Sequence, residues 1–471
     1  MHTNMTSGEA KPPKRAGAER AGRATSPQAA AGGGTRGARR RPRALRQLMA
    51  GSLVAAGVLA TVGTSAAAAS TGAKSHHAAP IDIALWESHN GGPVGGAMTT
   101  LVNRFDATHK AVHVSIVVTK ASTKLLVAIA AGNPPVLAEI SHYDGQYVKG
   151  GALVSWNSFM KGSSVVKQSN MLPATWVNGE VQGQHYRLEA DLKVSVVFYN
   201  KTMFKKVGIT APPRTWAQLA LDAAKVKRLG VIPLGWKDSS AHILPAFMSN
   251  GGTLLQGNNS VGTKVNFDSA SGVRTFSYFH SLYAAGELQF HHGTTLREDF
   301  GASKMAMIDG TSAGYQKALE AVGGKFPVGA FVEPAGSTGH ATNLAQGLGF
   351  VLPKGHSHAQ DEAAWTFVQW WFGAAQQVLW AERTGNAVET RAAIAATPKS
   401  FLASHPGLQA SYDAAASPYT VPRPVSDSYN EVQAVLDTEF FDAVTGKTSV
   451  AAALKTLEAQ GNSYMSGASS L

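Results

Sequence analysis

Short apolar segments alternate with helical patterns from residue 81 to about residue 465, and this alternation constrains the possible fold more than any other feature. Ile81–Trp86, Val112–Val118 and Val136–Ile140 have the length and composition of strands, and helical patterns over residues 94–108 and 123–131 separate them. Strands that are separated by helices are typical of an α/β lobe. We therefore expect a mostly parallel sheet that is covered by helices.

The second half of the chain repeats this alternation. We predict strands at residues 194–199, 304–308 and 348–352, and helices at residues 201–207, 217–229, 270–285, 314–322 and 362–382. The last of these helices is rich in aromatic residues, several of which recur at the 3.6-residue period. That period indicates core packing more strongly than stacking on a ligand.

The formal net charge of +12 suggests a nucleic-acid or membrane partner until the charges are located. Residues 1–79 contain twelve Lys and Arg against two Glu, whereas the remaining residues contain thirty basic and twenty-eight acidic side chains. A nearly neutral body has no overall attraction for a phosphate backbone. We therefore expect no nucleic-acid partner.

The N-terminal region has the order of a secretory signal. A basic stretch, Arg36–Arg46, precedes the apolar run Leu48–Gly63 and the small residues Thr64–Ser70. We predict that residues 1–79 are a disordered basic segment plus a signal peptide, with the mature N-terminus between about Ala66 and Ala73. An uncleaved anchor is the alternative. Either outcome places the protein outside the cytoplasm, in a periplasm or at the cell surface.

Signals for catalysis are few. The chain has no cysteine, which excludes disulfides, thiolate metal ligands and Cys nucleophiles. The run Gly310–Gly314 matches the G-x-S-x-G elbow of serine hydrolases, and Asp361 and His405 follow in the order that this class uses. No HGGG-type oxyanion loop precedes it, and 49 glycines make the pattern easy to match by chance. A secreted serine hydrolase is therefore the alternative function.

Other cofactor signals are missing from the sequence. No nucleotide-binding glycine loop and no H-E-x-x-H motif occur. The adjacent pairs His76-His77 and His291-His292 lack the spacing of metal ligands on one helical face. We expect neither a cofactor nor a metal.

Six blocks between residues 80 and 465 carry a resemblance to a known family. They are Ile83–Trp86 with Gly91–Pro93 and Leu101–Phe105; Leu125–Pro135; Phe198–Phe204 with Pro212–Trp216; Ser249–Leu254; Lys304–Gly310; and Ala364–Trp370 with Trp380–Gly385. In this order they resemble the extracellular solute-binding proteins of bacterial ABC importers, in the carbohydrate-binding family 1 that includes maltose- and glycerol-3-phosphate-binding proteins.

The resemblance implies an α/β, two-lobed periplasmic-binding-protein fold of type II, with hinge crossings near residues 192–193, 344–345 and 391. It implies one lobe from residues 80–192 with 346–391 and a second from residues 193–345 with 392–471. A monomer that binds a carbohydrate reversibly, without transforming it, and passes it to an ABC transporter permease is the implied function.

The chain departs from the glycerol-3-phosphate binders at informative positions. His142 stands where that group has an acidic residue, and Asn386 stands where it has an aromatic residue. The run Leu192–Val194 replaces a Ser-Ser-Thr run. The resemblance therefore implies a different carbohydrate-like ligand.

Candidate ligand-binding residues follow the strands or lie at the implied crossings, because ligands of open parallel sheets bind beyond the carboxyl ends of strands. They are Glu87, His142, Asp144, Asp191, Lys193, Trp236, Asp238, Thr311, Ser312, Gly347, Asn386 and Arg423. Carboxylates accept hydrogen bonds from sugar hydroxyls, and an indole face stacks on a sugar ring.

Simpler interpretations remain open for several of these residues. Asp191 could be a charge at a strand end, and Trp236 could belong to a lobe core. Thr311 and Ser312 could cap the next helix. His142 could be a plain loop residue, and Arg423 could be solvated.

Overall fold

The computed structural model describes residues 79–89, 91–141, 144–237, 239–256, 262–291, 295–424, 426 and 428–467. The predicted signal peptide and the pair His76-His77 lie outside these residues, as do the candidates His142 and Asp238. Asp144 is placed in a helix, but its side chain is not described. Within the described part, no helix is long and apolar enough to cross a membrane.

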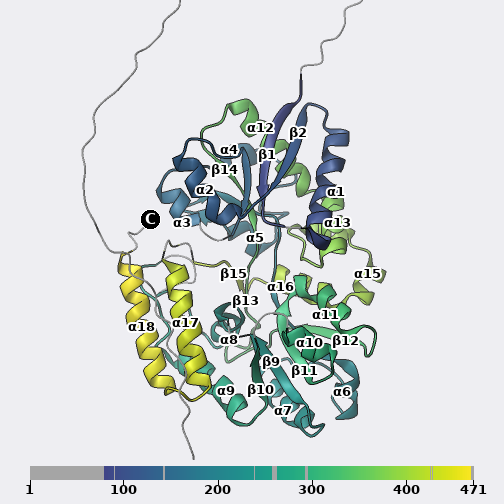
Figure 1. The fold of residues 1–471 in the computed structure, drawn as a ribbon, viewed down its shortest axis with the longest axis vertical. Coiled ribbons are helices and arrows are strands. Elements are labelled where there is room, and N and C mark those ends of the chain that lie inside the picture. Colours follow the sequence, from purple (N-terminus) through teal and green to yellow (C-terminus); the bar gives the residue numbers. More distant parts are fainter. Residues whose placement is uncertain are drawn as a thin grey trace, which may run out of the picture. The chain divides into compact units, whose positions relative to one another are not determined.

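The first sheet joins segments from both halves of the chain (Figure 1). Its strand order is β2 (Val112–Val118), β1 (Ile81–Glu87), β3 (Leu137–Ile140), β14 (Gly349–Pro353) and β4 (Leu153–Val154), and β7 (Arg187–Glu189) also pairs with β14. β1 runs parallel to β2 and β3, whereas β14 runs antiparallel to β3, β4 and β7.

The second sheet has the order β10 (Leu288–His291), β9 (Ile232–Lys237), β11 (Met305–Thr311), β8 (Ser195–Asn200) and β12 (Val328–Val332). β8 runs antiparallel to both of its neighbours. One strand of each sheet, β14 in the first and β8 in the second, runs opposite to all the other strands of that sheet. The prediction of a mostly parallel sheet is therefore confirmed, with one antiparallel strand in each sheet. The chain reaches β8 and β14 directly from the other lobe, without a crossover helix of the same sheet. The β-α-β connection that favours parallel pairing therefore does not set the direction of these two strands. Two small ladders are β13 (Asn343–Leu344) with β15 (Thr420–Val421), and β5 (Glu180–Val181) with β6 (Gln184–His185).

Helices surround each sheet, and we call each sheet with its helices a lobe. The first lobe holds α1 (Gly92–Thr108), α2 (Ala121–Ala130), α3 (Asp144–Lys149), α4 (Asn157–Met160), α5 (Pro173–Val177), α12 (His358–Trp371) and α13 (Ala374–Thr384). The second lobe holds α6 (Lys201–Lys206), α7 (Trp216–Lys227), η1 (Ser240–His242), α8 (Leu244–Ser249), α9 (Ala270–Ala284), α10 (Thr295–Gly301), η2 (Ser312–Gly314), α11 (Tyr315–Val322), α17 (Tyr429–Val444) and α18 (Val450–Gly467). Between them in sequence lie α14 (Arg391–Ala396), α15 (Lys399–Ser404) and α16 (Pro406–Ala416).

The helix α1 has the buried face that its sequence predicts. Pro93 lies in its first turn, where the missing N–H has no intrahelical partner to lose. Its buried residues include Met98, Leu101, Val102 and Phe105, which recur at helical spacing. The predicted apolar face of this helix is confirmed.

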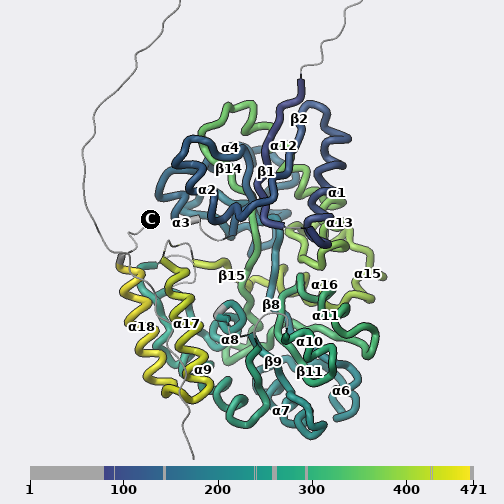
Figure 2. Tube along the Cα trace, viewed as in Figure 1, coloured from purple at the N-terminus to yellow at the C-terminus, as the bar shows by residue number. Residues whose placement is uncertain are grey.

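The aromatic segment predicted as one helix over residues 362–382 is two helices, α12 and α13. Gly373 has an extended backbone and forms the N-cap of α13, which ends the first helix and starts the second. Trp365, Trp371 and Trp380 are buried in the core of the first lobe. The core interpretation of this segment is therefore confirmed. Figure 2 shows α13 beside α1, although their sequences are far apart.

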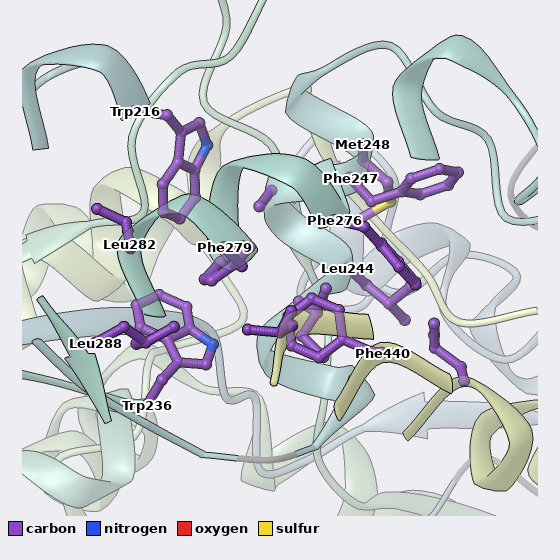
Figure 3. Packing of buried hydrophobic residues seen from close by; sticks show 14 of the residues in the cluster. Trp216, Trp236, Leu244, Phe247, Met248, Phe276, Phe279, Leu282, Leu288 and Phe440 are labelled. Atoms are coloured by element: carbon purple, nitrogen blue, oxygen red, sulfur yellow. The ribbon is translucent and has the colours of Figure 1, made fainter. Parts of the chain in front are cut away.

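The core of the second lobe is built by aromatic residues from distant segments (Figure 3). Trp236 of β9 lies 5.3 Å from Phe279 of α9 and 6.1 Å from Trp216 of α7, measured between ring centroids. Phe440 of α17 contacts the same Phe279. The C-terminal helices α17 and α18 thus complete the core that α9 begins.

Three segments lead the chain between the lobes, and the third is the one that contains α14, α15 and α16, between α13 and α17. Residues 190–194 lead from β7 to β8, residues 345–348 lead from β13 to β14, and Lys193 and Gln346 form an antiparallel bridge between them. A shared apolar cluster contains Leu172, Leu192, Ala345 and Leu408, which come from both sides of the expected lobe boundaries. The boundary residues themselves stay a prediction.

Candidate functional site

Two carboxylates lie opposite each other at the carboxyl ends of β1 and β3. Trp86 pairs with Ala138 in this parallel ladder, so Glu87 and Glu139 occupy the next positions of the neighbouring strands. Both side chains are buried. Burial raises the pKa of Glu87; the backbone N–H of His89 lowers it in part, and the charge of Glu139 raises it further. Like charges on adjacent strands destabilise a sheet unless a cation compensates for them.

His89 supplies a positive group next to this pair. Its Nε2 lies 3.1 Å from Glu139 Oε2 and 3.7 Å from Asp191 Oδ2, and its backbone N–H donates to Glu87 Oε2 at 2.5 Å. The ring of Trp380 packs edge-on at 6.0 Å. Burial alone would lower the pKa of His89, but the two carboxylates outweigh it and raise this pKa to about 9.

Asp191 joins this group to the first crossing. It is completely buried, its Oδ2 lies 2.5 Å from Lys193 Nζ, and its Oδ1 accepts a hydrogen bond from Asn386 Nδ2. Burial raises the pKa of Asp191, and Lys193 and His89 offset part of this effect. Lys193 keeps 28% of its side chain exposed. We call Glu87, His89, Glu139, Asp191, Lys193 and Asn386 the crossing cluster.

A second polar layer supports the crossing cluster. Arg187 lies 2.6 Å from Glu189 through Nη1 and Oε2, and it donates to Asn178 Oδ1 at 2.9 Å. Glu389 accepts a hydrogen bond from the backbone of Leu192 at 3.1 Å. Burial raises the pKa of Glu389 well above its usual value. These groups fix the backbone that presents Asp191 and Lys193.

Gly347 and Arg423 lie next to the crossing cluster. A Cβ at Gly347 would overlap the carbonyl oxygen of Asp191, so this position needs a glycine for the two crossings to touch. Arg423 donates from Nη2 to Gln346 Oε1 at 2.9 Å, and Gln346 bridges Lys193. Five candidates (Glu87, Asp191, Lys193, Asn386 and Gly347) therefore come together, with Arg423 connected to them through Gln346.

Trp236 does not join the crossing cluster. It has no exposed surface, and its Nε1 donates to the carbonyl oxygen of His242 at 3.1 Å within the second-lobe core. The indole packs among Phe279 and Trp216 and has no exposed surface, so it is not open to a sugar ring (Figure 3). We therefore remove Trp236 from the candidate site and assign it to the core.

Thr311 and Ser312 end β11 at the start of η2. Thr311 makes no side-chain cap bond. Ser312 is completely buried, its N–H donates to Val194 O at 2.9 Å, and its Oγ lies 3.4 Å from Val194 N. These bonds tie the crossing strand to β11. Within the described residues, no hydrogen bond joins the Ser312 hydroxyl to a histidine ring, since its Oγ accepts from Val194 N and the Nδ1 of His405 contacts Phe401 O and Ser404 Oγ.

Two members of the crossing cluster, His89 and Glu139, were not among the predicted site residues. Glu139 had a usable signal: it is the one charged residue in the otherwise apolar strand Leu137–Ile140, and a buried charge is rarely left without a partner. His89 lies two residues after β1, in the segment where ligand groups are expected. Its proximity to Asp191 has no signal in the sequence.

A cavity of about 810 Å³ lies elsewhere, between β12 and the helices α15 and α16. Its lining includes Pro212, Phe331, Leu402 and Pro406, with Arg214 and Lys399 among the charged members. None of the crossing cluster lines it. The crossing cluster is the candidate site because it collects several buried charged groups, whereas Glu333 is the one buried charged residue in the described lining of the cavity.

Comparisons with known proteins agree with this architecture. The family model described as bacterial extracellular solute-binding protein matches residues 100–410. The sn-glycerol-3-phosphate-binding periplasmic protein UgpB of Pectobacterium atrosepticum is 22% identical, over 82% of this chain and 92% of the relative.

Solved structures show the same fold. The cyclic alpha-maltosyl-1,6-maltose binding protein of Arthrobacter globiformis has a TM-score of 0.71 at 20% identity, covering 82% of this chain and 100% of that one. The sugar-binding protein MalE of Xanthomonas citri has a TM-score of 0.74 at 18% identity, covering 82% and 98%. The predicted two-lobed fold is confirmed.

Proposed function

We propose that this chain, which belongs to the family of bacterial extracellular solute-binding proteins, captures a sugar or sugar-like solute and delivers it to the membrane permease of an ABC transporter. The crossing cluster is the observation that supports the binding site. It presents the partly exposed groups Lys193 and His89 on buried carboxylates, at the place where the chain passes between the lobes. Sugar-binding relatives of the same fold support the choice of ligand class.

The charge of the crossing cluster supports an uncharged ligand. Three carboxylates face two basic groups, which leaves the cluster without an excess of positive charge for a phosphate ester. Hydroxyl groups, in contrast, both donate to carboxylates and accept from an ammonium group. We therefore favour a neutral saccharide or polyol over glycerol 3-phosphate, although one relative is named for that ester.

We also propose that binding leaves the solute chemically unchanged. The hydrolase alternative has no support, because the hydroxyl of Ser312 is buried against the backbone of Val194. Proteins of this family act outside the cytoplasm, so this chain is exported. Cleavage of the predicted signal peptide and the monomeric state stay predictions.

A panel of neutral saccharides and polyols, with glycerol 3-phosphate included, tests the proposal by thermal unfolding and calorimetry. We expect at least one neutral member to raise the Tm, since a ligand at 100 times its Kd stabilises the folded state by about 2.7 kcal/mol. Mass spectrometry of the recovered solute should find it intact. A response to the phosphate ester alone would contradict the neutral-ligand proposal, and turnover that Ser312→Ala abolishes would revive the hydrolase.

Lys193→Met is the site variant for the same titration. Removing the ammonium group should weaken binding by about 5- to 150-fold, which corresponds to about 1–3 kcal/mol. Lys447→Met is the matched control, because Lys447 also pairs with an aspartate, Asp442, but lies between α17 and α18. Equal affinities of the two variants would remove the crossing cluster from the binding site.

A further inference from the structure

The carboxyl ends of β1 and β3 bring together three groups of the kinds that ligate metals. One oxygen each of Glu87 and Glu139 and one ring nitrogen of His89 all lie within 4.8 Å of one another. Glu87 and Glu139 are buried, and 11% of the His89 side chain is exposed. The group is therefore reachable from solvent on its histidine side only.

One carboxylate oxygen of Glu139 has no partner. The side chain is completely buried, and its Oε2 pairs with His89 Nε2 at 3.1 Å, but within the described part of the chain Oε1 accepts no hydrogen bond. A buried carboxylate oxygen without a partner is costly, and it points toward a cation that would bind it. This unpartnered oxygen is an observation separate from the spacing of the three groups.

The charges around the group are compatible with a bound divalent cation. Three acidic groups, Glu87, Glu139 and Asp191, face two basic groups, Lys193 and His89, which leaves an excess of one negative charge. A divalent cation that binds the imidazole nitrogen in place of its proton, together with Lys193, balances the three carboxylates.

We propose that Glu87, His89 and Glu139 form a binding site for a divalent transition-metal ion of the zinc class. One imidazole and two carboxylates are ligands that Zn²⁺ accepts, and three protein ligands leave a coordination position for water or another oxygen donor. Trp380 packs edge-on against the imidazole, at 6.0 Å between the ring centroids. The site goes beyond the proposed solute binding and does not depend on it.

Metal titration of the purified full-length protein, treated first with EDTA, tests the site. The parent protein and every variant in this experiment carry His76→Ala and His77→Ala, so that the adjacent histidines of the N-terminal region cannot bind the added ion. Calorimetry with ZnCl₂ should give one equivalent, and Co²⁺ should give visible absorption bands that indicate ligation by the protein. Absence of stoichiometric binding would overturn the proposal.

Glu139→Gln and His89→Asn should each weaken Zn²⁺ binding by at least about 10-fold. His113→Asn is the matched control, since His113 pairs with Asp106 at 2.9 Å on the exposed side of the same lobe and should leave the affinity unchanged. If a site variant does not fold, X-ray absorption of the Zn²⁺-loaded parent protein should still show one imidazole among oxygen ligands.

The outcomes separate this site from the solute site. Equal affinity of the parent and both site variants, or a Zn²⁺ environment without imidazole, would show an adventitious ion and overturn the proposal. The saccharide panel is run in EDTA, so it reports solute binding whether or not a metal site exists.

Discussion

At the scale of the residue, Gly347 constrains the crossing through its backbone. Its φ of 145° lies in a region that residues with a Cβ rarely adopt, and a Cβ there would overlap Asp191 O and Glu189 Oε1. We expect Gly347→Ala to lower the free energy of unfolding by about 1–3 kcal/mol, measured by urea denaturation.

Gly96→Ala is the control for this substitution. Gly96 lies in α1, and no atom comes within 4 Å of the position that a Cβ would take, so alanine should leave stability unchanged or raise it by up to about 1 kcal/mol. If both variants unfold at the same urea concentration as the parent protein, the close approach at Gly347 is not a constraint on the fold.

At the scale of the element, Trp236 fixes β9 against α7 and α9. Its ring contacts Trp216 and Phe279, and its N–H donates to His242 O in η1. We expect Trp236→Ala to lower the free energy of unfolding by about 3–5 kcal/mol, because the removed indole leaves a cavity in the core. The affinity of the remaining folded protein for any saccharide that the panel identifies should stay unchanged, which calorimetry below the unfolding transition measures.

Tyr464→Ala is the matched control, since this aromatic residue of α18 is 44% exposed and should change stability by no more than about 0.5 kcal/mol. The opposite pattern for Trp236→Ala, with normal stability and lost affinity, would return this residue to the binding site.

At the scale of the whole molecule, buried carboxyl groups in the two lobes set the pH dependence of stability. Burial raises the pKa of Glu333 well above its usual value, with a further rise from Asp309; burial also raises that of Glu389, near Glu189 and Asp191. The folded protein therefore keeps protons that the unfolded chain releases above about pH 4.5. This contribution to stability is complete below that pH and is lost as pH rises through the raised pKa values.

We accordingly expect the urea midpoint to fall as the pH is raised from about 5 to about 8. Glu333→Gln and Glu389→Gln should each reduce this dependence, because an amide has no proton to lose. Glu362→Gln, at an exposed position of α12, should retain it. A midpoint that rises with pH would contradict the assigned direction of these shifts.

The sequence by itself determined the elements and the general fold. The apolar periods of α1 and of the segment that contains Trp365 and Trp371 reflect which faces must be buried, and this information is local. The six ordered blocks indicated the family that the comparisons support. The break at Gly373 was missed, because a helical period continues through a glycine without showing whether the backbone does.

Only the tertiary structure decided which polar groups meet. Asn386 reaches Asp191 across 195 residues, and His89 lies between Glu139 and Asp191, which belong to different strands and crossings. The tertiary structure also decided the role of Trp236. A tryptophan near a strand end suits a ligand site or a core equally well until its neighbours are known. Local sequence patterns show which face of a helix or strand is buried. A binding site depends on contacts between segments that are far apart in sequence, and no local pattern shows which segments meet.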